Sequence, residues 1–273
     1  MLNKILMIAD IHIKCSRLHE EYKEVLTNFI EDIKPVCDEN TLILCAGDVV
    51  DNFTTISNEL VVFVSWFFQE LDQIGCPVFV IAGNHDLTRG NLSKMDSLSP
   101  IFKTNNFQNV RYLDMILGYQ SGILEWDENY SFCLYSIFDE YRESDILSYK
   151  KDNPNKVIIG LIHAPLIGSR TPLGFTMDKG IRSNIFDGCD IVLSGDIHQP
   201  QTILLKNNVK FHYSGSMIMQ NFGEKIDGHG YSIISLPDFE IKHVEIENPY
   251  KLYKFEINSQ NDIENDMEIL KNG

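Results

Sequence analysis

Five short apolar runs constrain the fold of this chain more than any other feature. They occupy residues 5–9, 42–46, 78–82, 157–162 and 191–193. They are rich in β-branched side chains, and Asp, His or Gly follows each of them directly or after one serine. Short runs that are apolar almost throughout are typical of strands covered on both faces. We therefore expect a largely parallel sheet whose strands deliver polar groups to their carboxyl ends.

Two helices are expected between the first three runs. Residues 17–34 carry apolar side chains at helical spacing and end before Pro35. Residues 57–74 begin at Ser57, a favourable N-cap residue, and stop before Gly75. The centre of this second helix is apolar nearly all round, which fits either a helix wedged against the sheet or an exposed stripe for self-association.

The remaining elements alternate less regularly. We expect a short helix within 91–104, strands at 110–113 and 130–137, and a polar helix at 143–151. From residue 201 the pattern becomes antiparallel, with strands at 202–205, 209–213, 231–236 and 241–246 that close a second sheet, and one more strand at 252–257. The chain is long enough, at 273 residues, for one large α/β domain with a small appendage.

Composition limits the possible partners and setting. The 39 acidic and 23 basic residues give a net charge of −16, which opposes long-range attraction to nucleic acid or to anionic membranes. The six cysteines are scattered without a CxxC pair, and no apolar stretch reaches the roughly 20 residues of a bilayer span. A reduced cytoplasmic location and no membrane association are expected.

Polar clusters follow all five runs and include four of the eight histidines. They are Asp10-Ile11-His12, Gly47-Asp48, Gly83-Asn84-His85-Asp86, His163 and Gly195-Asp196-Ile197-His198. In open α/β sheets, sites form outside the carboxyl ends of the strands, so these clusters are expected to meet in one crevice. Carboxylate, imidazole and amide groups without thiolate suit two divalent ions such as Mn²⁺, with Mg²⁺, Fe²⁺ or Zn²⁺ as competitors.

The ordered set DxH, GDxxD, GNHD, H and GDxH resembles the calcineurin-like metallophosphoesterase superfamily. The segments Phe211-His212-Tyr213-Ser214-Gly215-Ser216 and Asn221-Phe222-Gly223-Glu224 look like those of the SbcD-type recombination nucleases, and other stretches are similar to phage and large-virus members of that group. This resemblance, over residues 4–246, implies a four-layer α/β/β/α sandwich of two mixed sheets flanked by helices. It also implies a metal-dependent phosphodiesterase that cuts DNA.

Carried over by position, the resemblance implies two metal sites. Asp10, His12, Asp48 and His198 would hold one ion, and Asp48, Asn84, His163 and Asp196 the other. His85 would protonate the leaving oxygen. Asp86 would either orient His85 or stabilise its own turn. The departure is Asp196, where the superfamily usually has histidine; its extra carboxylate is expected to favour Mn²⁺ or Mg²⁺ over Zn²⁺.

The resemblance also implies partners. Such nucleases work with an SbcC-type ATPase and dimerise through helices that correspond here to 57–74 and 91–104. The catalytic domain is expected at 1–248, and 249–273 is expected to be a tail that could start a missing or shortened cap domain. In the family, the cap domain and the helices that bind the ATPase would follow this point in the chain. The alternatives are a phosphodiesterase or phosphatase for a small or nucleotide substrate, and a binding subunit whose metal site has decayed.

Several other polar residues have weaker patterns. His212 is expected on a sheet face, and His19, His229 and His243 at the surface. The basic residues Arg170, Lys179 and Arg182 flank the loop after His163 and are either phosphate contacts or solvated charges.

Overall fold

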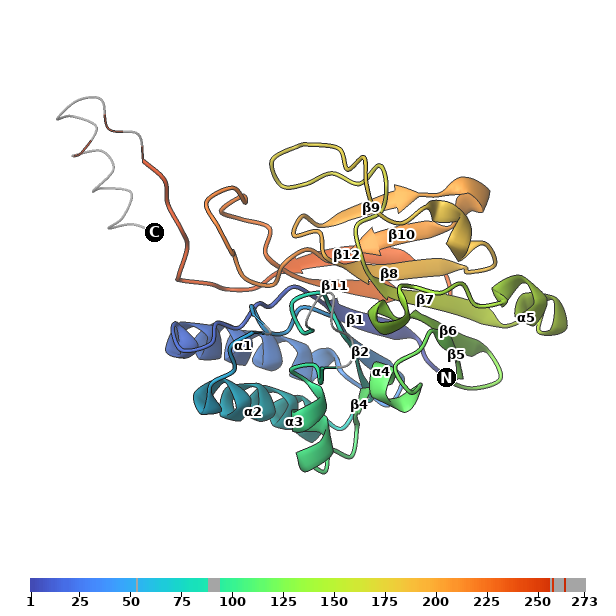
Figure 1. Cartoon of the computed structure of the whole chain (residues 1–273), viewed down its shortest axis with the longest axis horizontal. Helices are drawn as coiled ribbons and strands as arrows, with labels where there is room; N and C mark the ends of the chain where they lie inside the picture. Colours follow the sequence, from blue (N-terminus) through green and yellow to red (C-terminus); the bar gives the residue numbers. More distant parts are fainter. Residues whose placement is uncertain (53, 88–93, 256, 258–262, 264–273) are drawn as a thin grey trace.

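A computed structural model describes residues 1–52, 54–87, 94–255, 257 and 263, and within them two six-stranded mixed sheets stack face to face (Figure 1). The first sheet has parallel strands on one side and an antiparallel hairpin on the other. Its order is β12 (Glu240–Glu245), β11 (Gly230–Ser235), β1 (Lys4–Ile8), β2 (Thr41–Ala46), β3 (Val78–Ile81) and β4 (Val110–Tyr112).

The second sheet is parallel at its centre and antiparallel at both edges. Its order is β5 (Gly122–Glu125), β6 (Tyr130–Tyr135), β7 (Val157–His163), β8 (Ile191–Gly195), β10 (Lys210–Tyr213) and β9 (Gln201–Leu204). The paired registers leave the carboxyl ends of β7 and β8 side by side, with His163 opposite Gly195.

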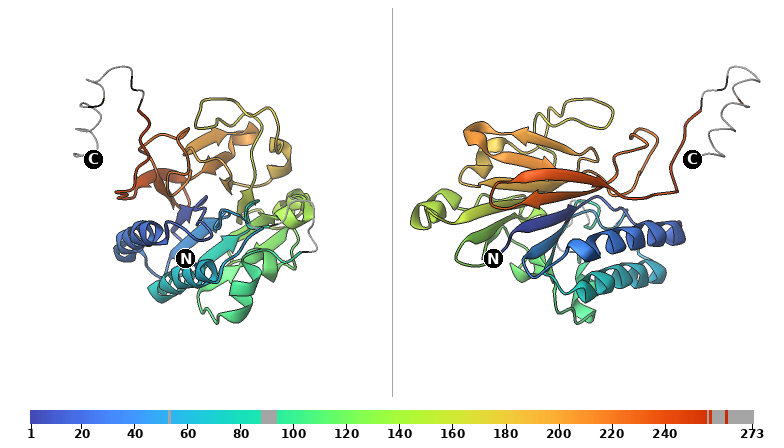
Figure 2. Two further views of the ribbon diagram at one scale, coloured as in Figure 1. Left: turned by 60° about the vertical axis from the view of Figure 1, so that its left-hand side comes forward. Right: turned by 180° about the vertical axis from the view of Figure 1, so that it is seen from behind.

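Helices α1 (His19–Ile33), α2 (Asn58–Ile74) and α3 (Ser99–Thr104) cover the outer face of the first sheet. Figure 2 shows α1 and α2 on the side that faces away from the second sheet. The Ser57 side chain accepts the Leu60 N–H and Gly75 is left-handed after α2, as the sequence predicts. The short α4 (Leu113–Ile116) follows β4, and four 3₁₀ turns lie at Lys34–Val36, Ile137–Asp139, Ser183–Phe186 and Lys206–Asn208.

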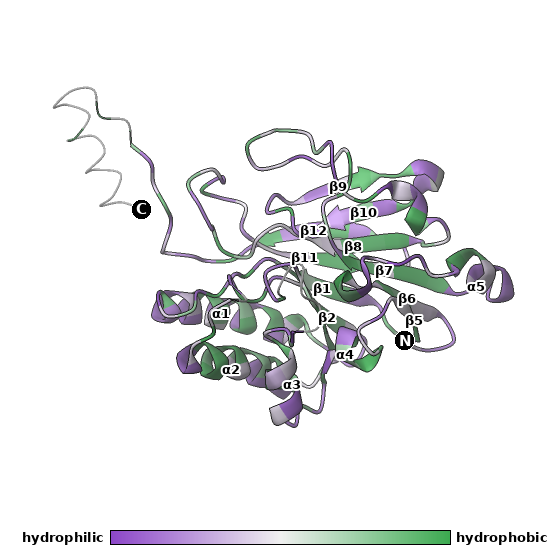
Figure 3. Ribbon diagram, viewed as in Figure 1, coloured by the Kyte–Doolittle hydropathy of each residue, from purple (hydrophilic) through white to green (hydrophobic). Residues whose placement is uncertain are grey.

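Three apolar clusters hold the layers together, and one of them lies between helices α1 to α3 and the outer face of the first sheet. Side chains such as Met7, Leu44, Phe79, Phe132 and Leu161 interlock between the sheets and are buried. A third cluster joins the far face of the second sheet to α5 (Ile146–Asp152) and to the segment 164–190. Figure 3 shows hydrophobic residues concentrated in the strands and hydrophilic residues in most loops. Burial on both faces explains why the sequences of these strands are nearly continuous apolar runs.

The four-layer α/β/β/α architecture expected from the sequence is confirmed, with four corrections of detail. The antiparallel strands do not all close the second sheet, because β11 pairs with β1 and brings β12 into the first. Strand β5 was not expected, and residues 252–255 form no strand. Of the expected helix at 91–104, residues 91–93 lie outside the described residues and α3 begins at Ser99.

Among the residues that the structure describes, no helix is both long and apolar enough to cross a bilayer.

Candidate metal centre

Five of the predicted ligands meet where the carboxyl ends of β1 and β2 face those of β7 and β8, namely Asp10, His12, Asp48, His163 and His198. Asp10, His12 and Asp48 are buried and hold left-handed backbone with φ of 52°, 52° and 53°. Asp196 has a φ of 91°. Non-glycine residues rarely adopt this region, and such backbone tends to persist at functional sites, where the surrounding structure enforces it. The loops are thus shaped to aim side chains inward rather than to continue the strands.

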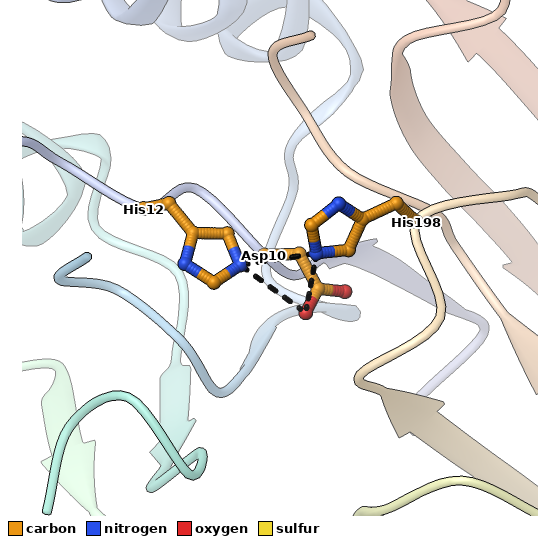
Figure 4. A group of neighbouring side chains, drawn as sticks. All are labelled: Asp10, His12 and His198. Carbon is orange, nitrogen blue, oxygen red and sulfur yellow. Dashed lines mark hydrogen bonds and ion pairs between the residues drawn. The ribbon is translucent and has the colours of Figure 1, made fainter. Parts of the chain in front are cut away.

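One group of possible ligand atoms combines Asp10, His12 and His198 (Figure 4). The Nε2 atoms of the two histidines lie 3.1 Å apart, and each lies 4.0 Å from Oδ1 of Asp10. Such spacings suit neighbouring ligands around one ion, whose bonds to nitrogen and oxygen are roughly 2.0–2.2 Å long. The donor set therefore fits a divalent cation.

A second group combines Asp10, Asp48 and His163. Nε2 of His163 lies 3.2 Å from Oδ2 of Asp48 and 3.9 Å from Oδ1 of Asp10. The other ring nitrogen, Nδ1, donates to the main-chain oxygen of Ala46 over 2.8 Å, which fixes the ring and aims Nε2 at the carboxylates. This Nε2 is buried and has no hydrogen-bond partner among the described residues, as expected of an atom kept for a metal.

Burial and mutual charge shift the pKa values of these groups. Burial raises the pKa of Asp10 to about 6, and burial lowers the pKa of His12 to about 3. Burial alone would raise the pKa of Asp48, but the neighbouring His163 and His12 outweigh it and hold this pKa well below its ordinary value. The centre is therefore built to be neutralised by bound cations.

His85 and Asn84 stand beside the second group at the end of β3. The His85 main-chain N–H donates to Oδ1 of Asp48 over 2.7 Å, and its ring packs edge-on against that of His12 with centroids 4.7 Å apart. His12, Asp48 and His85 form a third group of possible ligand atoms. Asn84 is buried, whereas His85 is partly exposed, which leaves the His85 ring open to a substrate.

Asp86 is fully buried beneath this turn. Its Oδ2 accepts the Gly83 N–H over 2.8 Å and its Oδ1 accepts the Val50 N–H over 3.1 Å. Burial raises its pKa to about 8. These hydrogen bonds favour the turn-stabilising interpretation of Asp86 over a direct contact with the His85 ring.

Asp196 contributes its backbone to the centre. Its N–H donates to both carboxylate oxygens of Asp10, over 3.0 and 3.2 Å. Within the described part of the chain, the three groups of possible ligand atoms leave out the Asp196 carboxylate. Its charge is nevertheless close enough to raise the pKa values of Asp10 and His163.

Glu224 holds one of the candidate ligands, His198, and the sequence analysis did not predict this contact. Its Oε1 accepts from Nδ1 of His198 over 2.8 Å and from the Asn221 side chain over 2.7 Å. A carboxylate on the outer nitrogen of a metal-binding histidine fixes the ring and raises its basicity. The sequence signal for this contact was the position of Glu224 in segment 221–224, which resembles the SbcD-type nucleases.

Glycines allow these loops to pack without side-chain interference. A Cβ on Gly83 would lie 2.2 Å from Oδ1 of Asp48, and one on Gly47, whose φ is +90°, would lie 2.4 Å from Nδ1 of His163. The close approach of these backbones therefore requires glycine.

The four remaining histidines differ in their burial and contacts. His212 is buried between Thr202 and Ser232 on a sheet face, as expected. The prediction that His229 lies at the surface is wrong, because this ring is buried and contacts Ser216 Oγ and the Lys225 carbonyl. His19 and His243 are half-buried.

A cavity of about 360 Å³ opens beside His198. Pro172, Pro200, Glu224, His229 and His243 are among the residues that line it. This volume lies in the range of small-ligand sites.

Comparison with known proteins agrees with this geometry. The model of the family described as calcineurin-like phosphoesterase matches residues 3–200. An uncharacterized protein of Acanthamoeba polyphaga mimivirus is 33% identical over 251 residues, which cover 89% of this chain and 18% of that protein. The chain thus spans less than a fifth of the length of this curated relative.

Two solved structures share the fold at low sequence identity. A dimetal phosphatase from Danio rerio is 11% identical with a TM-score of 0.55, and the match covers 92% of this chain and 98% of that one. The protein TT1561 of Thermus thermophilus is 12% identical with a TM-score of 0.53, and the match covers 91% and 99% of the two chains.

Proposed function

Since the chain belongs to the calcineurin-like phosphoesterase family, we propose that it hydrolyses phosphodiester bonds of DNA with two divalent ions, with Mn²⁺ as the preferred metal. The convergence of Asp10, His12, Asp48, His163 and His198 in one crevice carries the proposal. Asp10, His12 and His198 would hold one ion, and Asp48, His163 and Asn84 would hold the other. When bound, the ions supply positive charge that activates water and stabilises charge on the phosphate.

The protein's own residues would orient the reaction. Nδ1 of His85 is tied to a main-chain carbonyl, so Nε2 is the atom available to give a proton to the leaving sugar oxygen. The His85 main-chain N–H and the loop glycines hold Asp48, while Glu224 holds His198. Asp196 would hold Asp10 through its N–H and add negative charge to the centre.

The preference for DNA rests on the resemblance of residues 211–216 and 221–224 to the SbcD-type nucleases. These segments lie at the site, because Glu224 contacts His198 and the Ser216 N–H donates to the His198 carbonyl. Because the net charge is −16, DNA binding would depend on local contacts, for which Arg170, Lys179 and Arg182 are the candidates.

Partners follow from the same resemblance. We propose residues 1–248 as the catalytic domain, an SbcC-type ATPase as partner, and a homodimer through the helices at 57–74 and 91–104. On α2, the inner face is buried, whereas Val62 is 69% exposed and Trp66 half-buried. Sedimentation of the wild-type protein and of Val62→Lys tests the dimer: a monomeric wild type would contradict it.

A small or nucleotide phosphoester is the second candidate substrate. The cavity beside His198 and the acidic surface favour it, and one structure with the same fold is a dimetal phosphatase.

The test compares substrates on one preparation. Linear double-stranded and single-stranded DNA, bis-nitrophenyl phosphate and cyclic nucleotides are incubated with the protein and Mn²⁺. We expect DNA cleavage that EDTA abolishes. Hydrolysis of only the small esters would move the assignment to the second candidate, and no cleavage of DNA with or without the ATPase would end the first.

A further inference from the structure

A chain of hydrogen bonds leads from His85 through Asp51 to Lys14. Nδ1 of His85 donates to the main-chain carbonyl of Asp51 over 2.6 Å. The Asp51 carboxylate in turn accepts from Nζ of Lys14 over 2.6 Å. Only 14% of the Lys14 side chain is exposed, so its charge lies in the wall of the crevice rather than in solvent.

The same ammonium group also contacts the segment between β10 and β11. Nζ of Lys14 donates to Oε1 of Gln220 over 3.1 Å. The main-chain N–H of Gln220 donates to Oε2 of Glu224 over 2.9 Å, and Oε1 of Glu224 accepts from Nδ1 of His198. Lys14 therefore stands between the residue that holds His85 and the residues that hold His198.

The backbone around Lys14 is anchored on three sides. Ile13 forms a bridge with Val50, and the Asp51 N–H donates to the Ile13 carbonyl. The His19 ring donates to the Lys14 carbonyl over 2.6 Å, and the Ser57 hydroxyl donates to the Cys15 carbonyl over 2.6 Å. With its backbone fixed to the start of both α1 and α2, Lys14 can reach only a small region with its side chain.

Gln220 also forms a hydrogen bond with the loop that carries His12. Its Nε2 donates to the Ile11 carbonyl over 3.0 Å, and the Tyr22 hydroxyl donates to the His12 carbonyl over 2.9 Å. The contact from Lys14 to Gln220 thus joins the three loops that carry His12, His85 and His198.

We propose that Lys14 is a positioning residue whose ammonium group locks the Asp51 loop to the Gln220 segment and so fixes His85 and His198 relative to each other. A lysine suits this place because one compact ammonium has three donors and can serve two acceptors on different segments. The part of this proposal that concerns turnover rests on the proposed phosphodiesterase function; the part that concerns the two rings does not.

The first test uses the metal-free full chain with ¹⁵N-labelled histidine. We expect the ring signals of both His85 and His198 to shift or broaden in Lys14→Met. They should stay in place in Lys34→Met, a matched change at an exposed lysine just after α1. Unchanged signals in Lys14→Met, or movement of only one ring, would overturn the coupling. Lys14→Gln gives the same comparison if Lys14→Met does not fold.

The second test measures turnover with Mn²⁺. Loss of a residue that orients metal ligands typically costs roughly 10–100-fold in activity or metal affinity. We expect kcat of Lys14→Met to fall by about this factor with KM changed by less than about threefold, and Lys14→Arg to recover part of the loss. A kcat within about twofold of wild type, or a loss that merely follows the unfolded fraction, would contradict the proposal. Wild-type protein without activity would reject the proposed function, and the ring signals would still decide the role of Lys14.

Discussion

Nδ1 of His85 donates a hydrogen bond to the main-chain carbonyl of Asp51 over 2.6 Å. A carbonyl only accepts, so the proton on Nδ1 is fixed and Nε2 alone can exchange a proton with a substrate. Main chain rather than a carboxylate therefore sets the tautomer, and a change of the Asp51 side chain would act on it only indirectly.

Replacing His85 with asparagine should lower kcat by about 10²–10⁴ while Mn²⁺ binding persists. The defect should be larger on DNA than on bis-nitrophenyl phosphate, because nitrophenolate leaves without protonation. Steady-state rates on both substrates and calorimetric Mn²⁺ titration check this. An equal defect on the two substrates would argue against a proton-donor role.

The change Asp196→His removes one negative charge from the centre. The site should then bind Zn²⁺ better relative to Mn²⁺, and the pH optimum should move to lower pH because the reacting water becomes more acidic. Activity profiles from about pH 5 to about pH 9 with each metal measure both effects. If neither changes, the Asp196 carboxylate has no influence on the metal site.

Metal affinity should rise with pH between about pH 5 and about pH 8. Burial lowers the pKa of His163, but Asp48 and Asp10 outweigh burial and raise it well above its usual value, so binding must expel this proton at neutral pH. Below about pH 6 the Asp10 proton must leave as well, and the slope should steepen. Titrations in buffers of different ionisation enthalpy count the released protons; an affinity that does not depend on pH would refute the assignment.

The variant Gly83→Ala should lose Mn²⁺ affinity by at least about tenfold, because its Cβ would overlap the Asp48 carboxylate and main chain at 2.2 and 2.3 Å. Gly122→Ala in β5 is the matched control, since its Cβ would meet only Leu117 at 3.9 Å. Calorimetry and thermal unfolding of both variants separate a local effect from a global one. Wild-type affinity in Gly83→Ala would mean that the loop adjusts freely.

Asp114 should make the free energy of unfolding depend measurably on pH. Burial raises its pKa from 3.8 to about 6, although the Ser136 hydroxyl and the Ala82 N–H oppose this. Because the pKa of Asp114 is higher in the folded than in the unfolded state, its bound proton stabilises the fold. This contribution is complete below the unfolded pKa and is lost as the pH rises through about 6. The unfolding free energy of wild type minus that of Asp114→Asn should therefore fall by up to about 3 kcal/mol between about pH 4 and about pH 7. Urea unfolding at both pH values checks this, and a constant difference would contradict it.

The sequence predicts the parallel strands well because both their faces are buried, so apolar runs such as 42–46 and 157–162 leave few alternatives. It also predicts that Asp10, His12, Asp48, His85, His163 and His198 meet, because each follows a strand end. It does not predict that β11 returns to β1, since an antiparallel hairpin can extend either sheet. Nor does it reveal the part played by Glu224 or Lys14, because such contacts depend on where loops distant in sequence come to lie.

Strand β1 lies between β2 and β11, with Lys4 opposite both Thr41 and Ser235. The pairing with β11 closes a loop of most of the chain, and native contacts of such long range slow folding. During synthesis, Asp10 and His12 are made long before residues 230–235, so one edge of their strand stays unpaired until those residues appear. A nascent chain that has not reached residue 230 therefore exposes this unpaired strand edge, which favours aggregation.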